Sequence, residues 1–317
     1  MERVREKEEG PEDIFTQAPY DFFTKSAPRR LKSVLRGASC YTVFRMARQR
    51  LGQHFLADAG WRDRIAQSIG ASRFATSFSP GPPSRTPWIE IGAGHGELTE
   101  HLLSTGLAVT AVELDPRLAA GLRKLAEQHP QLTVVEGDIL EVDLEKLLGG
   151  GRVRIYGNLP YYITSPILHR LFEHAASIEA IHIVIQKEVA ERLAARPGTS
   201  DYGYLSVLTQ YYSRAEIALE IPREAFRPPP EVTSALVSLR LPGAGAELRV
   251  GDEGRFLEFV KVCFAQKRKT LANNLRGLAG REMLRNIFAG MKLREDARAE
   301  QLSVGELAEI YRRVGAQ

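Results

Sequence analysis

The sequence is short of cysteine and contains no long apolar run. Only Cys40 and Cys263 occur in its 317 residues, far apart and without the spacing of metal ligands. This usage argues against a disulfide framework or a zinc site, predicts that no metal is bound, and favours a reducing, cytoplasmic setting. No segment approaches the roughly 20 apolar residues that span a bilayer, and no apolar stretch follows the charged N-terminus. We therefore expect a soluble protein that is not secreted and has no membrane partner.

The charge is not strongly of one sign. Lys and Arg number 43 against 39 Asp and Glu, a formal charge of +4, and so small an excess matters only where it is concentrated. It is concentrated in residues 261–285, which we interpret as one helical stretch, with Glu258 just before this range and Glu282 within it as the acidic residues. That density suits an RNA phosphate track, whereas a solvated helix face is the alternative. The predicted RNA-binding residues of this stretch are Lys267, Arg268, Lys269 and Arg276. Lys187 and Arg192 come from elsewhere in the chain and are expected to border the same RNA-binding cleft.

The first 48 residues lack a sustained apolar period. They begin with mixed charges and continue with scattered aromatics, prolines and basic residues, which is typical of a poorly ordered extension. Three interpretations stay open: a basic arm that touches nucleic acid, a leader without function, or a start assigned too early, with Met46 as the true first residue. We predict a catalytic domain over residues 49–241 and a helical, RNA-binding domain over residues 242–317, with a Gly- and Ala-rich boundary at residues 242–254.

Short apolar runs alternate with helical periodicity from residue 88 onwards. A run at residues 88–91 leads through a glycine turn into a helical pattern, and residues 178–185 are nearly all apolar, as in a strand buried on both faces of a parallel sheet. Residues 215–221 and 232–241 are expected to form an antiparallel pair at one end of the sheet, because the loop between them cannot hold a crossover helix. The pattern predicts an α/β, doubly wound, Rossmann-like domain with a mainly parallel seven-stranded sheet. Further strands are predicted at residues 108–112, 132–135 and 152–156, and a helix at residues 116–127.

Polar or glycine residues follow four of the predicted strands. A Gly-x-Gly-x-Gly turn that starts at Gly92 follows the first strand, Glu113 ends the second, Asp138 follows the third and Asn158 the fourth. The carboxyl ends of parallel strands meet at the sheet edge where ligands bind. There a glycine turn lets a ligand approach the backbone, and a carboxylate about 20 residues further on can accept both hydroxyls of an adenosine ribose. Asp138 can accept from an adenine amine, so the four positions together predict an adenosine-containing ligand.

Two cofactors use such an edge, a nicotinamide dinucleotide and S-adenosylmethionine. The pyrophosphate of the dinucleotide needs an uncharged helix N-terminus, but Glu97 directly follows Gly96 here. An acidic residue at that place disfavours a phosphate and suits the amino acid end of S-adenosylmethionine. The sequence therefore favours S-adenosylmethionine.

The motif Gly157-Asn158-Leu159-Pro160-Tyr161 lies where an apolar strand ends. The exocyclic amine of adenine is a poor nucleophile because its lone pair is delocalised into the ring. The side-chain oxygen of Asn158 and the backbone carbonyl of Leu159 can each accept one amine hydrogen and so aim the lone pair at a methyl donor. Pro160 stiffens the turn, and Tyr161 offers a face on which a flipped base can stack. The motif predicts methyl transfer to an adenine amine, a reaction that needs no tuned general base here.

A series of motifs runs from residue 52 into the C-terminal helices. These are residues 52–56 (GQHFL), 89–96 (IEIGAGHG), 112–115 (VELD), 137–138 (GD), 157–161 (GNLPY), 186–191 (QKEVAE), 197–198 (PG), 201–207 (DYGYLSV), 226–237 (FRPPPEVTSALV) and 264–275 (FAQKRKTLANNL). In kind and order they resemble the KsgA-like ribosomal RNA adenine dimethyltransferases. That family includes mitochondrial and eukaryotic dimethylases and, more distantly, the erythromycin-resistance methylases.

The resemblance implies a class I methyltransferase fold and S-adenosylmethionine as cofactor. The implied reaction is dimethylation of the exocyclic amines of two adjacent adenines in the 3′-terminal hairpin of small-subunit (16S) ribosomal RNA. The implied partner is that RNA within an assembling small ribosomal subunit, and the protein is expected to act as a monomer. The implied cofactor contacts are His54, Leu56, Gly92, Gly94, Glu113, Asp138 and Asn158. The implied catalytic residues are Asn158, Leu159, Pro160 and Tyr161, with Phe226 as the second aromatic wall of the base pocket.

The chain departs from the family pattern at two positions. His54 stands where Asn is also frequent, which keeps a polar contact available. Tyr162 stands where many bacterial members carry a second Asn, which leaves the fine shape of the target pocket open.

Two rival functions stay open. A DNA adenine or glutamine methyltransferase also places Asn or Asp before an x-Pro-aromatic step, but would not be expected to carry the basic helical tail or the FRPPPEV segment. A ribosome assembly or transcription factor that binds RNA through the same fold needs no catalysis, and the presence of Glu113, Asp138 and Asn158 argues against that alternative. Whether free RNA or an assembled subunit is methylated, and in what order the two adenines react, does not follow from the sequence.

Overall fold

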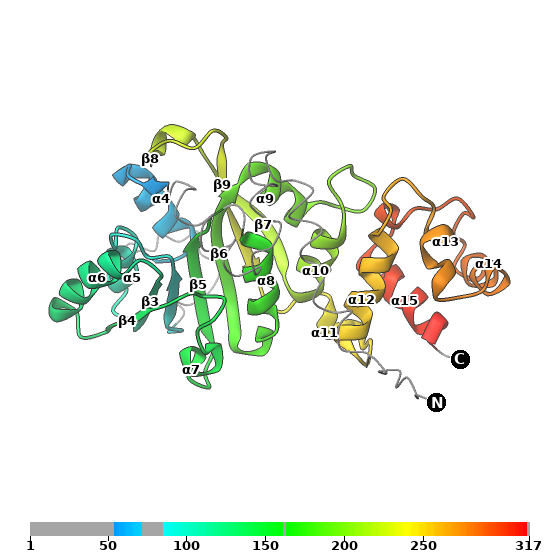
Figure 1. Cartoon of the computed structure of the whole chain (residues 1–317), viewed down its shortest axis with the longest axis horizontal. Helices are drawn as coiled ribbons and strands as arrows, with labels where there is room; N and C mark the ends of the chain where they lie inside the picture. Colours follow the sequence, from blue (N-terminus) through cyan, green and yellow to red (C-terminus); the bar gives the residue numbers. More distant parts are fainter. Residues whose placement is uncertain (1–53, 72–84, 161–162, 316–317) are drawn as a thin grey trace, which may run out of the picture. The chain divides into compact units, whose positions relative to one another are not determined.

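The computed structural model of the protein describes residues 54–71, 85–160 and 163–315, which belong to one compact unit (Figure 1). The predicted N-terminal extension, residues 1–48, lies outside the described residues, and so do Tyr161 and Tyr162. Among the described residues, no helix combines the length and the apolar character that crossing a membrane requires.

A seven-stranded sheet, in the order β4-β3-β2-β5-β6-β9-β7, carries the fold. The first five strands in this order, from β4 to β6, are parallel to one another, whereas β9 runs antiparallel to both β6 and β7. This confirms the predicted doubly wound sheet and the antiparallel pair at one end of it. The strands are β2 Trp88–Ile91, β3 Val109–Glu113, β4 Leu132–Glu136, β5 Val153–Asn158, β6 Ile178–Gln186, β7 Arg214–Ile221 and β9 Ser234–Arg240.

Helices connect the parallel strands and pack against them. Helix α6 begins where predicted, because Pro116 fits the first helical position and the Asp115 carboxylate accepts a hydrogen bond from the backbone N–H of Arg117 at 2.8 Å. Helices α5 and α6 contact β3, and α9 contacts β6, β7 and β9. The helices of this part are α4 Ala59–Ser68, α5 Thr99–Leu103, α6 Pro116–Gln128, α7 Leu144–Leu148, α8 Thr164–Phe172, α9 Lys187–Ala194 and α10 Tyr204–Tyr212, with short 3₁₀ turns η1 Ala175–Ser177 and η2 Arg223–Ala225.

Two short strands that are far apart in the chain form a second, two-stranded sheet. Strand β1 (Phe55–Leu56) pairs antiparallel with β8 (Phe226–Arg227), and Leu56 is the register partner of Phe226. The backbone N–H of Ala57 extends this contact by donating to the carbonyl of Ala225 at 2.9 Å. The pairing brings the segment before α4 next to the segment before β9.

The chain after β9 is helical, as predicted, but the basic stretch is not one helix. Residues 265–270 leave the helical conformation between α12 and α13, so Lys267, Arg268 and Lys269 lie in a turn. The prediction of a continuous helical stretch over residues 261–285 is therefore wrong. The breaks place the basic side chains on several elements, namely α12 Glu253–Phe264, α13 Leu271–Asn274, η3 Leu275–Gly277 and α14 Arg281–Gly290. These are preceded by α11 Gly245–Leu248 and followed by η4 Ala299–Gln301 and α15 Val304–Gly315.

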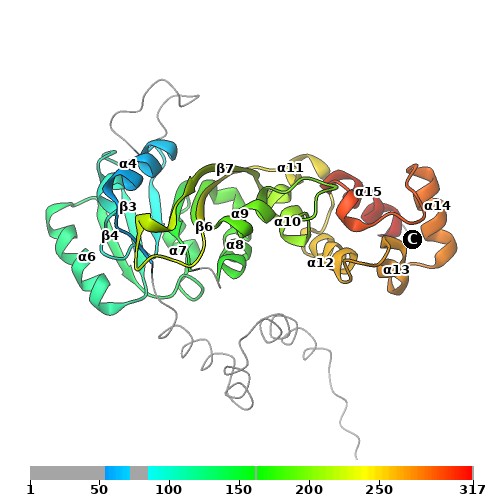
Figure 2. The same ribbon diagram turned by 90° about the horizontal axis from the view of Figure 1, so that it is seen from above.

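The C-terminal helices share a buried core with α10. Tyr202, Val207 and Tyr211 belong to the same hydrophobic cluster as Phe256 and Leu307, and α10 contacts α11, α12 and α15. Figures 1 and 2 both show α10 beside α11 and α12. The division into a catalytic domain over 49–241 and a second domain over 242–317 stays a prediction, and the core shows that residues 202–211 pack with the helices beyond it.

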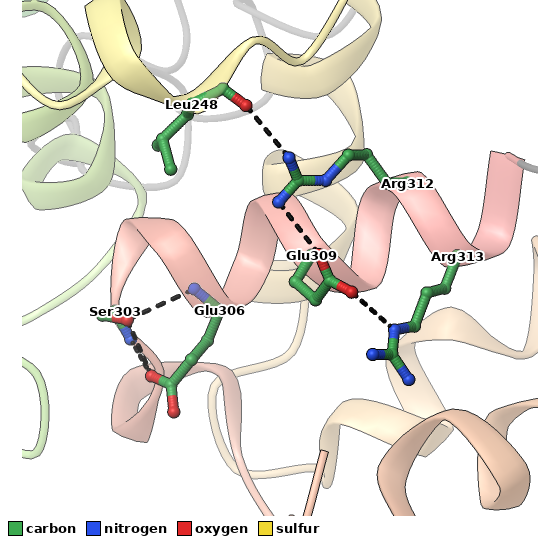
Figure 3. Close-up of polar contacts among 6 residues, drawn as sticks. All are labelled: Leu248, Ser303, Glu306, Glu309, Arg312 and Arg313. Atoms are coloured by element: carbon green, nitrogen blue, oxygen red, sulfur yellow. Dashed lines mark hydrogen bonds and ion pairs between the residues drawn. The ribbon is translucent and has the colours of Figure 1, made fainter. Parts of the chain in front are cut away.

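Helix α15 begins with a capping box and is tied to α11 (Figure 3). The Ser303 hydroxyl accepts from the backbone N–H of Glu306 at 3.3 Å, while the Glu306 carboxylate accepts from the backbone N–H and the hydroxyl of Ser303 at 2.8 and 2.7 Å. At the other end Arg312 donates to the carbonyl of Leu248 at 3.1 Å, and Glu309 pairs with Arg312 and Arg313 at 2.9 and 2.7 Å. The sequence Ser-x-x-Glu thus fixes where the last helix starts.

Replacing the cap should weaken the fold measurably. Ser303→Ala removes the acceptor for the N–H of Glu306 and should lower the free energy of unfolding by about 1 kcal/mol. Urea denaturation followed by circular dichroism measures this difference. Ser303→Thr retains a capping hydroxyl and should lose less, so an equal loss in both variants would show that the hydroxyl is not what stabilises the helix start.

Candidate active site

Four predicted site positions meet at one edge of the sheet. Strands β2, β3, β4 and β5 are parallel neighbours, and their registers pair Ile91 with Val112 and with Gly157, and Glu113 with Glu136. Their carboxyl ends therefore lie side by side. The structure brings together at this edge Gly92 after β2, Glu113 at the end of β3, Asp138 after β4 and Asn158 at the end of β5.

The carboxylate of Glu113 holds the glycine turn. Its two oxygens accept from the backbone N–H groups of Gly94 and Asp115, each at 2.9 Å, and the residue is 3% exposed. The turn needs glycine at position 94, because the backbone has φ +60° there and a Cβ would lie 3.2 Å from the Phe55 ring. Two backbone bonds thus orient a buried carboxylate at the ligand edge, and each oxygen keeps a second lone pair for a ligand.

Asp138 lies at the next strand end. Its carboxylate accepts from the backbone N–H of Leu140 at 3.0 Å, and 9% of the residue is exposed. Sequence reasoning missed Leu114, which directly follows Glu113 and is 46% exposed. An apolar residue immediately after the acidic end of a strand was the signal available in the sequence. Leu114 gives this polar edge an apolar surface.

Asn158 is anchored by one half of its amide. Its Nδ2 donates to the backbone carbonyl of His54 at 2.9 Å, across 104 residues of sequence. The side-chain oxygen is therefore the half of the amide that a ligand can use. The next residue, Leu159, is 2% exposed, and its N–H donates to the carbonyl of Val184 at 3.1 Å, which fixes the backbone where Asn158 ends β5.

Gly157 permits the close approach of β5 to β2. A Cβ at this position would lie 3.2 Å from the carbonyl oxygen of Ile91 and 2.8 Å from the Leu159 side chain. Gly157 therefore has a packing role in the GNLPY motif, and no larger residue fits without a shift of the strands.

His54 connects the anchor of Asn158 to the segment after β8. Its Nδ1 lies 2.7 Å from the carbonyl of Pro228, and because a carbonyl only accepts, Nδ1 carries the hydrogen in this contact. Leu56 on β1 and Phe226 on the paired strand β8 belong to one hydrophobic cluster. They are 7% and 1% exposed, respectively. Their predicted contacts with cofactor and base stay predictions, because both side chains are buried in this structure.

The remaining members of the predicted amine pocket are only partly described. Pro160 is exposed, and its carbonyl accepts from the N–H of Ile163 at 3.1 Å. Tyr161 and Tyr162 lie outside the described residues, so the stacking role of Tyr161 and the effect of Tyr162 stay predictions.

The predicted RNA-binding cations fall into two groups. Lys187 pairs with Glu220 at 2.8 Å, which raises its pKa, and Arg192 pairs with Glu188, so both positive charges are already balanced. A groove of about 280 Å³ adjoins Lys187 and is also lined by Gln186, Glu188, Glu191, Val232 and Thr233. In the second group, Arg268, Lys269 and Arg276 are exposed, and Lys267 is exposed and donates to the backbone carbonyl of Ser200. The turn between α12 and α13 is thus the stronger candidate for phosphate contacts.

Comparison with known proteins extends over most of the chain. The sequence model of the family described as "Ribosomal RNA adenine dimethylase" matches residues 45–315. The chain is 39% identical over 264 residues to the protein named "Ribosomal RNA small subunit methyltransferase A" of Xanthomonas euvesicatoria pv. vesicatoria, a match that covers 83% of this chain and 95% of that protein. A protein of the same name from Koribacter versatilis is 39% identical over 275 residues, with 83% of this chain and 92% of that protein covered.

Solved structures give the same fold. A dimethyladenosine transferase from Plasmodium falciparum superposes with a TM-score of 0.63 at 24% identity, covering 81% of this chain and 96% of that one. The 23S rRNA methyltransferase ErmE superposes with a TM-score of 0.58 at 28% identity, covering 82% of this chain and 99% of that one. These likenesses confirm the Rossmann-like fold predicted from the strand pattern and the methyltransferase fold that the resemblance implied. The match of the family model over residues 45–315 and the relatives at 39% identity show that the chain belongs to the ribosomal RNA adenine dimethylase family.

Proposed function

We propose that the protein transfers methyl groups from S-adenosylmethionine to the exocyclic amines of two adjacent adenines in the 3′-terminal hairpin of small-subunit (16S) ribosomal RNA. Membership of the family makes it a ribosomal RNA adenine dimethyltransferase. The observation that carries the proposed chemistry is the amide of Asn158, which is fixed through Nδ2 to the carbonyl of His54 at 2.9 Å and so keeps its oxygen for a substrate amine.

The residues at the sheet edge fit S-adenosylmethionine. A buried carboxylate, Glu113, is oriented by two backbone N–H groups and can accept both ribose hydroxyls. Asp138 supplies an acceptor suited to the adenine amine, and the exposed Leu114 supplies an apolar surface suited to the adenine ring. A Cβ at Gly94 would narrow the turn that the ligand approaches. When bound, the cofactor supplies an electrophilic methyl group.

The protein prepares the substrate amine through two acceptors. The oxygen of Asn158 and the carbonyl of Leu159 each accept one hydrogen of the amine, which makes the nitrogen pyramidal and aims its lone pair. The rigidity of this pair comes from the bond of Asn158 to His54 and from the bond of the Leu159 N–H to Val184. The amine loses its proton readily once it is methylated. The pocket therefore needs only to bind and orient the adenine and to exclude water. Tyr161 and Phe226 are the proposed walls for the flipped base.

The RNA is proposed to bind along the helices after residue 241. The exposed side chains of Lys267, Arg268, Lys269 and Arg276 form the proposed phosphate contacts, with Lys187 and Arg192 as weaker candidates because carboxylates already pair with them. We propose further that the substrate is the RNA within an assembling small subunit, and that the enzyme acts as a monomer in the cytoplasm. The carboxylate partners of Lys187 and Arg192 would be repelled by a phosphate, which favours the turn at residues 267–269 as the main contact.

Removing the charges of this turn should weaken RNA binding and its dependence on salt. Changing Lys267, Arg268 and Lys269 together to Gln should make the slope of log K against log salt less steep by about 1 for each phosphate that the variant no longer neutralises. Binding of small subunits at several salt concentrations measures the slope. A control that changes Lys124, Arg214 and Arg240 to Gln removes the same charge elsewhere. Equal changes in slope for both triple variants would show that no local phosphate track exists.

Radiolabelled methyl transfer tests the proposed function directly. S-adenosylmethionine with a labelled methyl group is incubated with the protein and with small subunits from a strain that lacks the dimethylase, and the RNA is digested to nucleosides. Label in dimethyladenosine of small-subunit RNA is the expected result. Label in DNA or in protein would favour a DNA adenine or glutamine methyltransferase. Subunit binding without any label would favour an assembly factor that does not need catalysis.

A further inference from the structure

We propose that Glu90 positions the glycine turn as a neutral carboxylic acid, and that the turn accepts the cofactor only while Glu90 carries its proton. The inference rests on the proposed function, because it assigns the turn at Gly92–Gly96 to the cofactor. Glu90 is a positioning residue in this account: it acts on the turn from below and does not touch the reacting atoms.

Glu90 lies within the sheet and links the two sides of the glycine turn. It lies in β2, with Ala111 of β3 and Tyr156 of β5 as register partners, and is 2% exposed. Its Oε2 accepts a hydrogen bond at 2.5 Å from the hydroxyl of Thr99, the fully buried first residue of α5. The bond therefore joins the strand before the turn to the helix after it. A Cβ at Gly96 would lie 3.7 Å from the same Thr99 hydroxyl, which places this bond directly beneath the turn.

The groups around Glu90 oppose a second negative charge. Glu97 from the end of the turn and Glu113 from β3 are the charged groups that act on it, and Tyr156 from β5 brings no positive charge. Burial, followed by these two carboxylates, raises the pKa of Glu90 to about 8, and the hydrogen bond from Thr99 opposes the rise. Glu113, by contrast, has two backbone N–H donors to hold a charge. Of the two buried acids, Glu90 is therefore the one that lacks backbone donors and is suited to remain neutral.

Ionisation of Glu90 should open the turn. A charged carboxylate at this position has one hydroxyl donor and two acidic neighbours, so it can be relieved only by admitting water beneath Gly92–Gly96. That movement would also release the N–H of Gly94 from Glu113, because both bonds belong to the same turn. The apparent affinity for the cofactor then falls in proportion to the fraction of molecules in which Glu90 is protonated.

Calorimetric titration with S-adenosylhomocysteine at pH 7 and pH 9 tests the proposal. This probe lacks the sulfonium charge, and its amino group titrates identically with every variant, so differences between variants report on the protein. The wild-type Kd should rise about tenfold more between the two pH values than the Kd of Glu90→Gln, as expected for a required proton with a pKa of about 8. The exposed control Glu100→Gln should behave like the wild type. Equal pH dependence in Glu90→Gln and wild type, or tighter wild-type binding at pH 9, would overturn the proposal.

Thermal unfolding provides a second measurement that does not involve the cofactor. The pKa of Glu90 is raised in the folded state, so its contribution to stability is fully present below its unfolded pKa, near 4.5, and is lost as pH rises through about 8. Glu90→Gln has no such loss. It should therefore melt close to the wild type at pH 5 and above it at pH 8.5. A difference in melting temperature between the variant and the wild type that stays the same from pH 5 to pH 8.5 would contradict the raised pKa of Glu90.

The two measurements separate this proposal from the proposed function. Suppose that neither the wild type nor any variant binds the probe at any pH, while the melting temperatures follow the expected pattern. The assignment of the cofactor to this edge is then wrong, but the conclusion that Glu90 is neutral in the fold holds. If all variants bind the probe with the same pH dependence, the cofactor site stands and the role of Glu90 falls.

Discussion

Asn158→Ala should lower the rate of methyl transfer at least about a hundredfold, the usual effect of removing one preorganised polar group that acts in the transition state. The variant loses the acceptor that makes the adenine amine pyramidal, whereas the exposed cations of the α12–α13 turn are unchanged. Binding of small subunits from a dimethylase-deficient strain should therefore persist. Single-turnover transfer of a labelled methyl group, with subunit binding measured in parallel, separates the two effects.

Two further variants sharpen this result. Asn158→Asp keeps an acceptor oxygen but sets a second oxygen against the carbonyl of His54, where Nδ2 now lies at 2.9 Å. It should transfer methyl groups more slowly than the wild type and faster than Asn158→Ala. Asn286→Ala, on the exposed side of α14, removes an amide of the same kind and should have no effect. Normal methylation by Asn158→Ala would show that the proposed handling of the amine is wrong.

Glu113→Ala should nearly abolish cofactor binding. The wild-type carboxylate is proposed to accept both ribose hydroxyls, and hydrogen bonds to charged groups contribute about 1.5 to 3 kcal/mol each. Their joint loss corresponds to a rise in Kd of roughly a hundredfold or more. The variant also frees the N–H of Gly94 and of Asp115, both held at 2.9 Å in the wild type, so the turn itself loses its shape. Calorimetric titration with S-adenosylhomocysteine measures the loss.

A matched control and a second ligand make the Glu113 result specific. Glu100→Gln lies on the exposed side of α5, close in sequence to the glycine turn, and should bind as tightly as the wild type. The 2′,3′-dideoxy analogue of the probe lacks the ribose hydroxyls, so Glu113→Ala should weaken its binding by a smaller factor than it weakens the binding of S-adenosylhomocysteine. An equal loss of affinity for both ligands would place the role of Glu113 in the turn alone.

The strands were predictable because their sequences are locally consistent. The predicted run at residues 88–91 is β2 itself, and the apolar run at 178–185 forms β6 with one additional residue. Helix α6 starts at the predicted proline because its cap and first residue both favour that start. The prediction of a continuous basic helix was wrong. The charged residues 267–269 are not accompanied by apolar residues at helical spacing, and the chain turns there. Charge density indicates a solvated surface but does not specify its secondary structure.

The contacts that finish the site could not be predicted, because they join residues far apart in the chain. The carbonyl of His54 that holds Asn158 is 104 positions away, and the carboxylate of Glu220 that balances Lys187 lies on β7. The rule that the carboxyl ends of parallel strands meet at one edge of the sheet places Glu113, Asp138 and Asn158 together without any knowledge of these contacts. It says nothing about Glu90, whose burial and acidic neighbours depend on the packing of three strands and α5.

The pairing of β1 with β8 has a consequence for when the site can form during synthesis. Phe55 and Leu56 take their ladder partners from Phe226 and Arg227, and His54 contacts Pro228 as well as Asn158. The ribosome must therefore translate past position 228 before the asparagine that handles the substrate amine acquires its full surroundings. A chain released before that point can build β2 to β5 but leaves the amide anchor unsupported. The enzyme is thus expected to become active only after most of its own translation is complete.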